Sequence, residues 1–166
     1  MEGRLYMWSV ATGKKVDTLS HHYDAISAIS SNENGRWIAT AGYDKIIKVF
    51  NRSFRKNHYK LISHQEPVTT VNFLSSQRLL STDKEGSILI WDVVKSSVIG
   101  RLPSFDAHIT AVCLDKEEKF LFVAGLGGMV GLYDLQEEKL LKIDFLKQLA
   151  SITPVSYTHL TLPTTR

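Results

Sequence analysis

The sequence has few of the residues that define several classes of protein. Its 166 residues include one cysteine, Cys113, so neither an internal disulfide nor a cysteine-rich zinc site is expected. No run of about 18 apolar residues is present, as a membrane-spanning helix would require. The polar opening Met1-Glu-Gly-Arg4 is not followed by the apolar segment of a secretory signal. These absences predict a cytoplasmic or nuclear protein without a membrane segment.

The sequence also has no strong excess of basic or acidic residues. The chain has 20 Lys and Arg against 17 Asp and Glu, a net charge of +3, with 43% hydrophobic and 22% charged residues. This composition is typical of an ordinary soluble globular protein. Overall charge therefore gives no reason to expect nucleic-acid binding. Cys113 lies in the apolar run 111–114, so we expect its thiol to be buried and inert.

What the sequence does contain is a repeat. Four short apolar runs each end on an aromatic residue, and these aromatics are spaced by 42, 41 and 42 residues: Trp8, Phe50, Trp91 and Tyr133. Small or acidic residues follow them, as is typical where a turn begins: Ser9, Asn51, Asp92 and Asp134. A constant period of this length predicts tandem structural units.

A second landmark has the same period. His22 and His64 are 42 residues apart, and each is followed by apolar residues four and seven positions later. In the next unit the aligned position is Phe105. His108 is either a displaced equivalent or unrelated, and we favour the second interpretation. Short linkers rich in glycine or acidic residues precede each run that ends on an aromatic, and these linkers indicate hairpins.

A four-stranded unit of about 40–45 residues, with His near its start and Trp-Asp near its end, resembles the repeat of the WD-repeat β-propeller family. The resemblance implies an all-β fold, an incomplete WD-repeat β-propeller of four-stranded antiparallel blades whose ring is not closed. Its expected divisions are a partial blade at 1–20, blades at 21–63, 64–103 and 104–146, and the start of a connection at 147–154. A ring needs about four to eight blades, so we expect a piece of a longer protein with uncovered faces at both ends.

The repeat also locates the strands. We expect them at 4–8, 15–19, 25–29, 37–41, 46–50, 59–62, 69–73, 78–81, 87–91, 97–102, 110–114, 120–124, 130–133 and 140–144. An alternative is a helix over 135–149, because Glu138 precedes Lys142 by four residues and Leu141, Phe145 and Leu149 share one helical face. The repeat favours the strand, and a helix fits best after Phe145.

Residues 155–166 have no counterpart in the repeat. From Val155 to Thr164 they match, residue for residue, the translation of a transposase mosaic end with its flanking primer site. We interpret 155–166 as a translated cloning adaptor, expect it to be disordered and exclude it from the prediction of the fold.

The resemblance also implies a role for the landmark residues. In the family, the His, a Ser or Thr, an Asp and the Trp form a hydrogen-bonded chain that stabilises one blade. Its expected members here are His22, Thr40 and Asp44 in one blade and His64, Ser81, Glu85 and Trp91 in the next. Phe50 has no indole N–H to donate, and the third blade has lost the chain.

Catalytic and metal-binding interpretations of these residues are weaker. A His–acid pair for acid–base catalysis is disfavoured because the acids lie in turns that the fold itself needs. Adjacent side chains on extended backbone point to opposite faces, so His21 and His22 cannot chelate one ion. We therefore expect no enzyme activity, no cofactor, no metal and no small-molecule substrate.

Two surfaces remain as candidates for partner binding. By resemblance, partners would contact the narrow face of the propeller through residues on its short loops: Tyr23, Tyr43, Lys45, Gln65 and Lys84. The segment 52–60 has four basic residues and no acid, which could contact RNA: Arg52, Arg55, Lys56 and Lys60. The first hypothesis is a non-catalytic protein-interaction scaffold that assembles a multiprotein complex. The alternatives are an RNA-associated propeller of an RNA-processing or ribosome-assembly particle, and a propeller appended to an enzyme.

Overall fold

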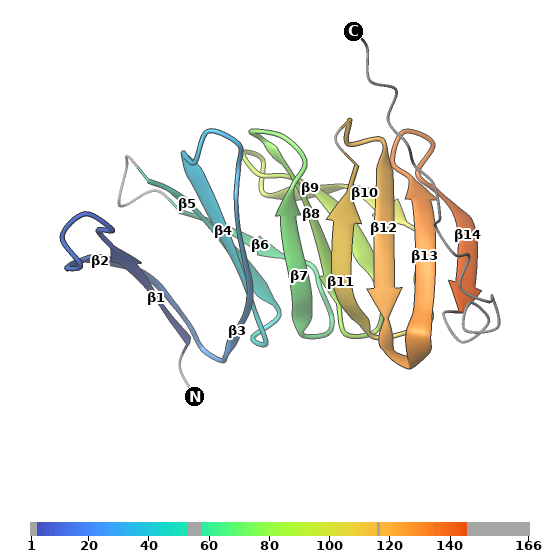
Figure 1. The fold of residues 1–166 in the computed structure, drawn as a ribbon, viewed down its shortest axis with the longest axis horizontal. Helices are drawn as coiled ribbons and strands as arrows, with labels where there is room; N and C mark the ends of the chain where they lie inside the picture. Colours follow the sequence, from blue (N-terminus) through green and yellow to red (C-terminus); the bar gives the residue numbers. More distant parts are fainter. Residues whose placement is uncertain (1–2, 53–57, 116, 146–166) are drawn as a thin grey trace, which may run out of the picture.

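The computed structural model describes residues 3–52, 58–115 and 117–145 (Figure 1). These residues form fourteen strands: β1 (Gly3–Trp8), β2 (Lys15–His22), β3 (Ile26–Ser31), β4 (Trp37–Gly42), β5 (Ile46–Asn51), β6 (His58–Ile62), β7 (Val68–Phe73), β8 (Arg78–Asp83), β9 (Ile88–Asp92), β10 (Ser97–Leu102), β11 (Ile109–Leu114), β12 (Phe120–Gly125), β13 (Met129–Asp134) and β14 (Lys139–Phe145). One 3-10 turn, η1 (Leu126–Gly128), joins β12 to β13.

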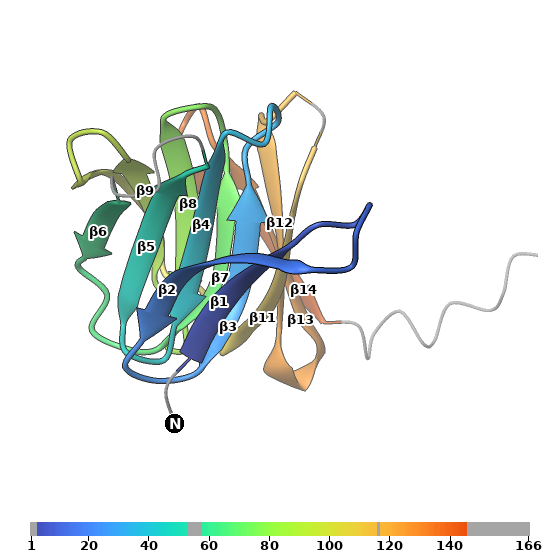
Figure 2. The ribbon, with the colours of Figure 1, turned by 90° about the vertical axis from the view of Figure 1, so that its left-hand side faces the viewer.

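The strands are arranged in four antiparallel sheets. β1 pairs with β2, and three four-stranded sheets follow in chain order, β3–β6, β7–β10 and β11–β14. Within each sheet, strands that are neighbours in sequence pair, so the three four-stranded sheets are meanders and β1–β2 is a hairpin. The first strand β7 contacts both β3 and β11, and the sheets stand side by side without closing into a ring (Figures 1 and 2). The all-β, unclosed architecture is confirmed.

The strand positions agree with those that the repeat predicts. β10 has the expected bounds, and most other strands extend an expected one by one or two residues. β2 continues to His22, past the expected boundary at residue 20. The helix alternative over 135–149 is wrong for residues 135–145, because 135–138 form a turn and Lys139–Phe145 is the strand β14. Residues 146–149 lie outside the described residues.

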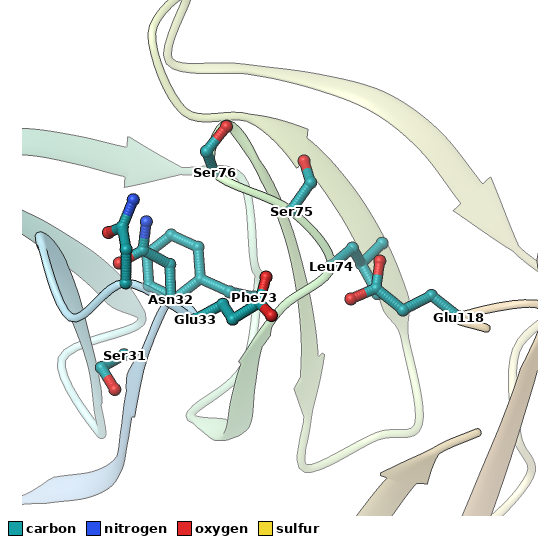
Figure 3. A pocket seen from close by; sticks show the side chains of 9 residues that line it. Ser31, Asn32, Glu33, Phe73, Leu74, Ser75, Ser76 and Glu118 are labelled. Atoms are coloured by element: carbon teal, nitrogen blue, oxygen red, sulfur yellow. The ribbon is translucent and has the colours of Figure 1, made fainter. Parts of the chain in front are cut away.

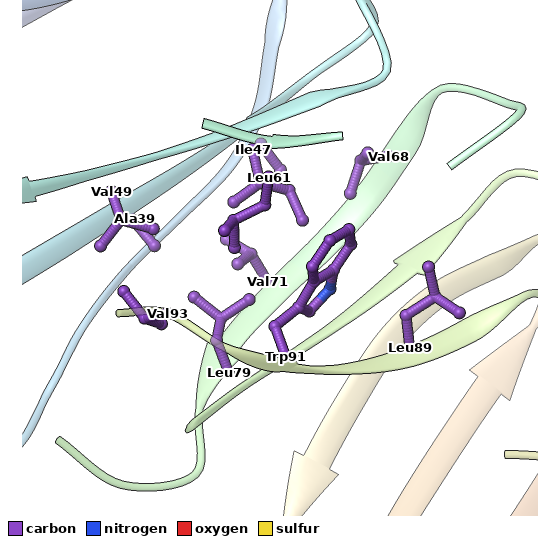
Figure 4. Close-up of a cluster of buried hydrophobic side chains, with 11 residues drawn as sticks. Ala39, Ile47, Val49, Leu61, Val68, Val71, Leu79, Leu89, Trp91 and Val93 are labelled. Atoms are coloured by element: carbon purple, nitrogen blue, oxygen red, sulfur yellow. The ribbon is translucent and has the colours of Figure 1, made fainter. Parts of the chain in front are cut away.

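The first hydrophobic core lies between the sheets β3–β6 and β7–β10. Ala39, Ile47, Val49 and Leu61 of the first sheet contact Val71, Leu79, Leu89 and Trp91 of the second (Figure 4). All are buried, and Trp91 is 1% exposed. Each large aliphatic or aromatic side chain buried in this way contributes about 1.5–3 kcal/mol to stability.

The second core lies between β7–β10 and β11–β14. It is formed from the other face of the middle sheet, for example by Leu80, Ile88 and Ile90, and it includes Phe105 and Tyr133. Successive strand residues point to opposite faces, so Leu79 and Leu80 belong to different cores. The middle sheet is therefore buried on both sides.

The opposite face of the sheet β11–β14 is not covered by another sheet of the described residues. Phe122 is 49% exposed, although Leu80, 42 residues earlier, is fully buried. Cys113 pairs with Phe122 across β11 and β12 and is also exposed, so the prediction of a buried thiol is wrong. The local apolar run indicates a strand, but burial of the thiol requires a neighbouring sheet on this side. At the other end of the array, Trp8 is 60% exposed.

Candidate protein-interaction face and the buried hydrogen-bonded chains

A buried hydrogen-bonded chain links His22, at the end of β2, to the second strand of the β3–β6 sheet and to the turn that follows it. His22 Nδ1 lies 2.9 Å from Asp44 Oδ1, and His22 Nε2 lies 2.8 Å from Thr40 Oγ1. Asp44 also accepts the backbone N–H of Tyr23 at 3.0 Å. The structure thus brings together the three residues that the sequence predicts for this sheet. Their bonds fix the segment before β3 against the β4–β5 turn.

The equivalent chain in the β7–β10 sheet is longer by one member. His64 Nδ1 lies 2.9 Å from Asp83 Oδ2, and His64 Nε2 lies 2.7 Å from Ser81 Oγ. Trp91 Nε1 donates to the same Ser81 oxygen at 2.7 Å. An ionised carboxylate only accepts, so Nδ1 carries the proton of a neutral ring, and Ser81 donates to Nε2.

The acid in this chain is Asp83 and not Glu85, which corrects the prediction. Asp83 pairs with Val68 as Gly42 pairs with Ile26, so Asp83 and Gly42 are equivalent. A Cβ at Gly42 would lie 2.5 Å from His22 Nδ1, so glycine leaves room there for the Asp44 carboxylate. In the next sheet the side chain of Asp83 occupies the equivalent space and contacts His64 directly. Glu85 is exposed and donates its backbone N–H to Asp83 Oδ1 at 3.1 Å.

The order Asp83–His64–Ser81 resembles the residues of a serine hydrolase, but its surroundings do not suit catalysis. Ser81 is fully buried, and Asp83 is 1% exposed. A nucleophile must reach its substrate, and the Ser81 oxygen is already within hydrogen-bond distance of both His64 and Trp91. Burial opposes the ionisation of Asp83, but hydrogen bonds from His64 and Ser87 outweigh it and hold the pKa of Asp83 below its ordinary value. This arrangement suits a structural link.

The β11–β14 sheet has replaced the chain with apolar contacts. Phe105 is fully buried, and Cβ atoms at Gly125 and Gly131 would lie 2.6 and 2.9 Å from its ring. Val123 has the cross-strand position that Ser81 has in the previous sheet. Tyr133 Oη is consequently buried without a hydrogen-bond partner among the described residues. Burial, with a smaller effect of the Asp106 charge, raises the pKa of Tyr133 to about 12.

Removing this hydroxyl is expected to stabilise the protein. Tyr133→Phe keeps the ring and eliminates a buried polar group that costs about 1 kcal/mol or more when unpaired. We expect the free energy of unfolding in denaturant to rise by about 1 kcal/mol. A decrease of similar size would show that Tyr133 Oη has a partner in solution.

We define the narrow face as the end of the sheets formed by the turns β4–β5, β8–β9 and β12–β13 and by the segments that precede β3, β7 and β11. It is the lower edge in Figure 1. Three equivalent backbone hydrogen bonds, each of 2.9 Å, connect a turn to its neighbouring segment: Tyr43 N–H to Ala25 O, Lys84 N–H to Pro67 O and Leu126 N–H to His108 O. The backbone of this face is thus held in the same way in all three sheets.

The sequence-predicted partner residues all lie on the narrow face. Tyr23 and Tyr43 are 72% and 46% exposed. Lys45 Nζ is hydrogen-bonded to Gln65 O and lies 3.6 Å from Glu66 Oε1, so it links two sheets. Gln65 and Lys84 are exposed. The structure therefore gathers these five residues on one surface.

Two further residues of this face were missed. Leu126 is equivalent to Tyr43 and Lys84 in its backbone bond and is 58% exposed. His108 is half-buried beside it and takes no part in a buried chain of the kind that His22 and His64 form, which agrees with the interpretation that it is unrelated to them. The only sequence signal for Leu126 as a residue of the narrow face is that it follows the predicted partner residue Lys84 by 42 residues, one repeat later.

A family model described as "WD domain, G-beta repeat" matches residues 13–51 and 55–92. The chain carries WD40 repeats. Each matched segment ends one residue beyond the aromatic residue of a third strand, Phe50 or Trp91, and these aromatic residues define the period. The sheet β11–β14 adds a third four-stranded meander of the same kind.

Curated relatives are WD-repeat proteins or are named for an interaction. The chain is 23% identical over 133 residues to chicken "p21-activated protein kinase-interacting protein 1-like", covering 80% of this chain and 36% of that protein. It is 22% identical to the Drosophila melanogaster "WD repeat-containing protein 55 homolog", covering 82% and 28%. Human "WD repeat-containing protein 55" is 23% identical, covering 76% and 33%. The chain thus spans about a third of the length of these relatives.

The narrow face of the WD repeats contains a pocket of about 420 Å³. It lies where the first strands β3, β7 and β11 begin. Its lining comes from all three sheets: Ile26, Ser27, Tyr43, Thr69, His108, Ile109 and Thr110. Tyr43 is therefore both exposed on the narrow face and part of the lining of this pocket.

A larger pocket of about 670 Å³ lies at the opposite end of the sheets, among the turns β3–β4, β7–β8 and β11–β12 (Figure 3). Glu33 and Glu118 come from different turns and both line it. Burial raises the pKa of Glu118, and the nearby charges of Glu33 and Asp115 raise it further, against the opposing effect of Arg78. Within the described residues, no group of three or more His, Cys, Asp or Glu could hold a metal ion.

The basic segment is only partly visible. Arg52 and Lys60 are exposed at its two ends, whereas Arg55 and Lys56 lie outside the described residues. The described part of the chain has no helix with the length and hydrophobicity that crossing a membrane requires.

Proposed function

We propose that this chain is part of a non-catalytic scaffold that binds partner proteins through its narrow face and helps to assemble a multiprotein complex. The observation that supports this proposal is the exposure of Tyr23, Tyr43 and Leu126 on turns and segments whose backbone hydrogen bonds hold them in place. WD-repeat proteins in general mediate protein–protein interactions and are not catalysts. The chicken relative is named for an interaction with a protein kinase.

The physical basis is the low cost of ordering such a surface. A partner that docks on a mobile loop must immobilise it, whereas these turns are already fixed by the bonds at Tyr43, Lys84 and Leu126. Tyrosine buries a large area with few rotatable bonds and is enriched among residues that dominate binding energy. Lys45, linked to Gln65 and Glu66, adds a polar contact at the rim of the two tyrosines.

The test is capture of partners by the full chain with Tyr23→Ala and Tyr43→Ala combined. We expect recovery of specific partners to fall about tenfold, which corresponds to the loss of about 1.4 kcal/mol of binding energy. The melting temperature should be nearly unchanged because both rings are exposed. Quantitative mass spectrometry of the captured proteins measures the first effect, and calorimetry the second.

Val94→Ala is the matched control. Val94 is 48% exposed, close to the 46% of Tyr43, but it lies in the β9–β10 turn at the other end of the sheets. It should leave partner recovery unchanged. Full recovery by the double tyrosine variant would refute the narrow-face proposal. The RNA-associated and enzyme-appended alternatives stay predictions, since no described residue favours either of them over protein binding.

A further inference from the structure

We infer that Asn34 is a site of spontaneous deamidation in the folded protein, which converts the β3–β4 turn to an aspartyl or isoaspartyl form. The inference concerns the end of the sheets opposite the narrow face and goes beyond the proposed function. Asn34-Gly35 is the only Asn-Gly pair in the sequence. Asparagine is one of the thermolabile residues. Because glycine has no side chain, its backbone nitrogen is open to attack the amide of the asparagine before it.

The reaction needs only the chain itself and water. The backbone nitrogen of Gly35 attacks Cγ of Asn34, the proton of that nitrogen passes to the leaving amide group, and the Cγ–Nδ2 bond breaks with release of ammonia. The product is a cyclic succinimide. Water then adds to one of the two carbonyl carbons of the ring and opens it. Opening at Cγ gives aspartate, whereas opening at the backbone carbonyl gives isoaspartate, in which the main chain runs through the former side chain.

The carbonyl group of the Asn34 side chain is already held and polarised for this attack. The backbone N–H of Arg36 donates to Asn34 Oδ1 at 2.9 Å. Negative charge develops on this oxygen when a nucleophile adds to Cγ, and a donor already in place stabilises that charge. The same bond folds the side chain of Asn34 back over the peptide group between Gly35 and Arg36. It therefore brings Cγ toward the nitrogen that attacks it.

The attacking nitrogen has one contact that activates it and one that restrains it. A Cβ added at Gly35 would have Arg52 Nη1 as its nearest atom, at 3.8 Å, and a cation so close favours loss of the amide proton. Gly35 N–H also donates to Asn32 O at 2.8 Å, and this bond must open before the attack. Asn34 is exposed, so water reaches the succinimide. These contacts predict a slow conversion that proceeds without unfolding.

The other asparagines of the described residues lack this combination. Asn32 and Asn51 are 5% and 4% exposed, and Asn32 Oδ1 accepts the backbone N–H of Trp37 at 2.9 Å. Asn72 lies within the strand β7, where the backbone is paired. Each of these three residues is followed by one with a long or bulky side chain. We therefore expect deamidation to be confined to Asn34 among them.

The conversion changes the charge of a pocket. Asn34 lines the pocket of about 670 Å³ at this end of the sheets, together with Glu33 and Glu118. Deamidation adds a third carboxylate to that lining. Burial and the charge of Glu33 already raise the pKa of Glu118, and a further negative charge acts in the same direction. The reaction thus makes this end of the protein more acidic without altering the narrow face.

The experiment follows the folded full chain during incubation at mildly alkaline pH. Mass spectrometry of digested samples measures deamidation at each asparagine, and methyl transfer from labelled S-adenosylmethionine by an isoaspartyl methyltransferase measures isoaspartate independently. We expect both signals to grow at Asn34 while Asn32, Asn51 and Asn72 stay intact. An unchanged Asn34, or conversion only after the chain is unfolded in urea, would overturn the inference.

Variants test the roles of the neighbouring residues. Asn34→Gln should abolish both signals. Arg52→Gln should slow the conversion about threefold, since charges at exposed positions interact weakly. Lys95→Gln, an exposed cation in the β9–β10 turn, is the matched control and should leave the rate unchanged. Equal rates for Arg52→Gln and the unmodified chain would overturn the part assigned to Arg52. The deamidated chain should capture partners as the unmodified chain does, so this inference and the proposed function fail independently.

Discussion

Gly86→Ala is expected to lower the free energy of unfolding by more than about 3 kcal/mol. Gly86 has a φ of +88°, which costs a residue with a side chain energy before any contact is considered. An added Cβ would also lie 1.7 Å from the carbonyl oxygen of Phe105. Denaturant unfolding of the full chain measures the loss, and a shift to lower denaturant concentration is the expected result.

The collision at Gly86 cannot be relieved by a small movement. Gly86 O accepts the N–H of Phe105 at 3.0 Å, and Gly86 N–H donates to Asp83 O at 3.1 Å. The first bond joins the β8–β9 turn to the segment before β11 and thus joins two sheets, whereas the second closes the β8–β9 turn itself. An alanine would have to break one of them or displace Phe105, whose ring is fully buried in the second core.

Gly13→Ala is the matched control for this prediction. Gly13 also has a positive φ, of +64°, but an added Cβ would have no atom within 4 Å. Its substitution should therefore cost only the backbone strain, about 1 kcal/mol. If the two variants lost equal stability, strain alone would explain the effect and the contact between Gly86 and Phe105 would carry no weight.

The strands could be predicted from the sequence because two independent patterns specify them. The aromatic residues, spaced by 41 or 42 residues, locate the end of each third strand, and His22 and His64, 42 residues apart, locate the starts of two units. Local signals were less reliable. The pattern over 135–149 also fits a helix, but β13 offers its edge to residues 139–145, and pairing with that edge decides the structure.

The errors concern features that depend on contacts between segments. Cys113 lies in an apolar run, yet its exposure is set by whether another sheet covers β11. Leu126 and His108 have no local sequence motif, and a backbone bond between two loops holds them on the narrow face. Glu85 has the same distance to Trp91 as Asp44 has to Phe50, so alignment by period selects it. Which carboxylate contacts the histidine depends instead on the residue at the position of Gly42 and Asp83. Gly42 leaves room for Asp44 to contact His22, whereas Asp83 at the equivalent position contacts His64 itself.

This correction leads to the second prediction of a large effect. Asp83→Ala should destabilise the protein by about 3 kcal/mol, because it leaves the buried Nδ1–H of His64 and the N–H of Ser87 without their acceptor. Glu85→Ala is the matched variant two residues away. Glu85 is exposed, so its loss should change stability by no more than about 0.5 kcal/mol. If Glu85→Ala were the more destabilising of the two, Glu85 would be the acid of the hydrogen-bonded chain, as the alignment of the repeats predicts.

The pH dependence of stability tests the same carboxylate by another measurement. Because the pKa of Asp83 in the folded protein is lower than its ordinary value of 3.8, its ionised form stabilises the fold above pH 3.8. That contribution is lost as the pH falls below 3.8 through the lowered folded value. The stability difference between the unmodified chain and Asp83→Ala should therefore narrow in this acid range, whereas Glu85→Ala should follow the unmodified chain throughout. Thermal unfolding at a series of pH values measures both, and a difference for Asp83→Ala that stays constant into acid would show that its carboxylate does not contribute as an anion.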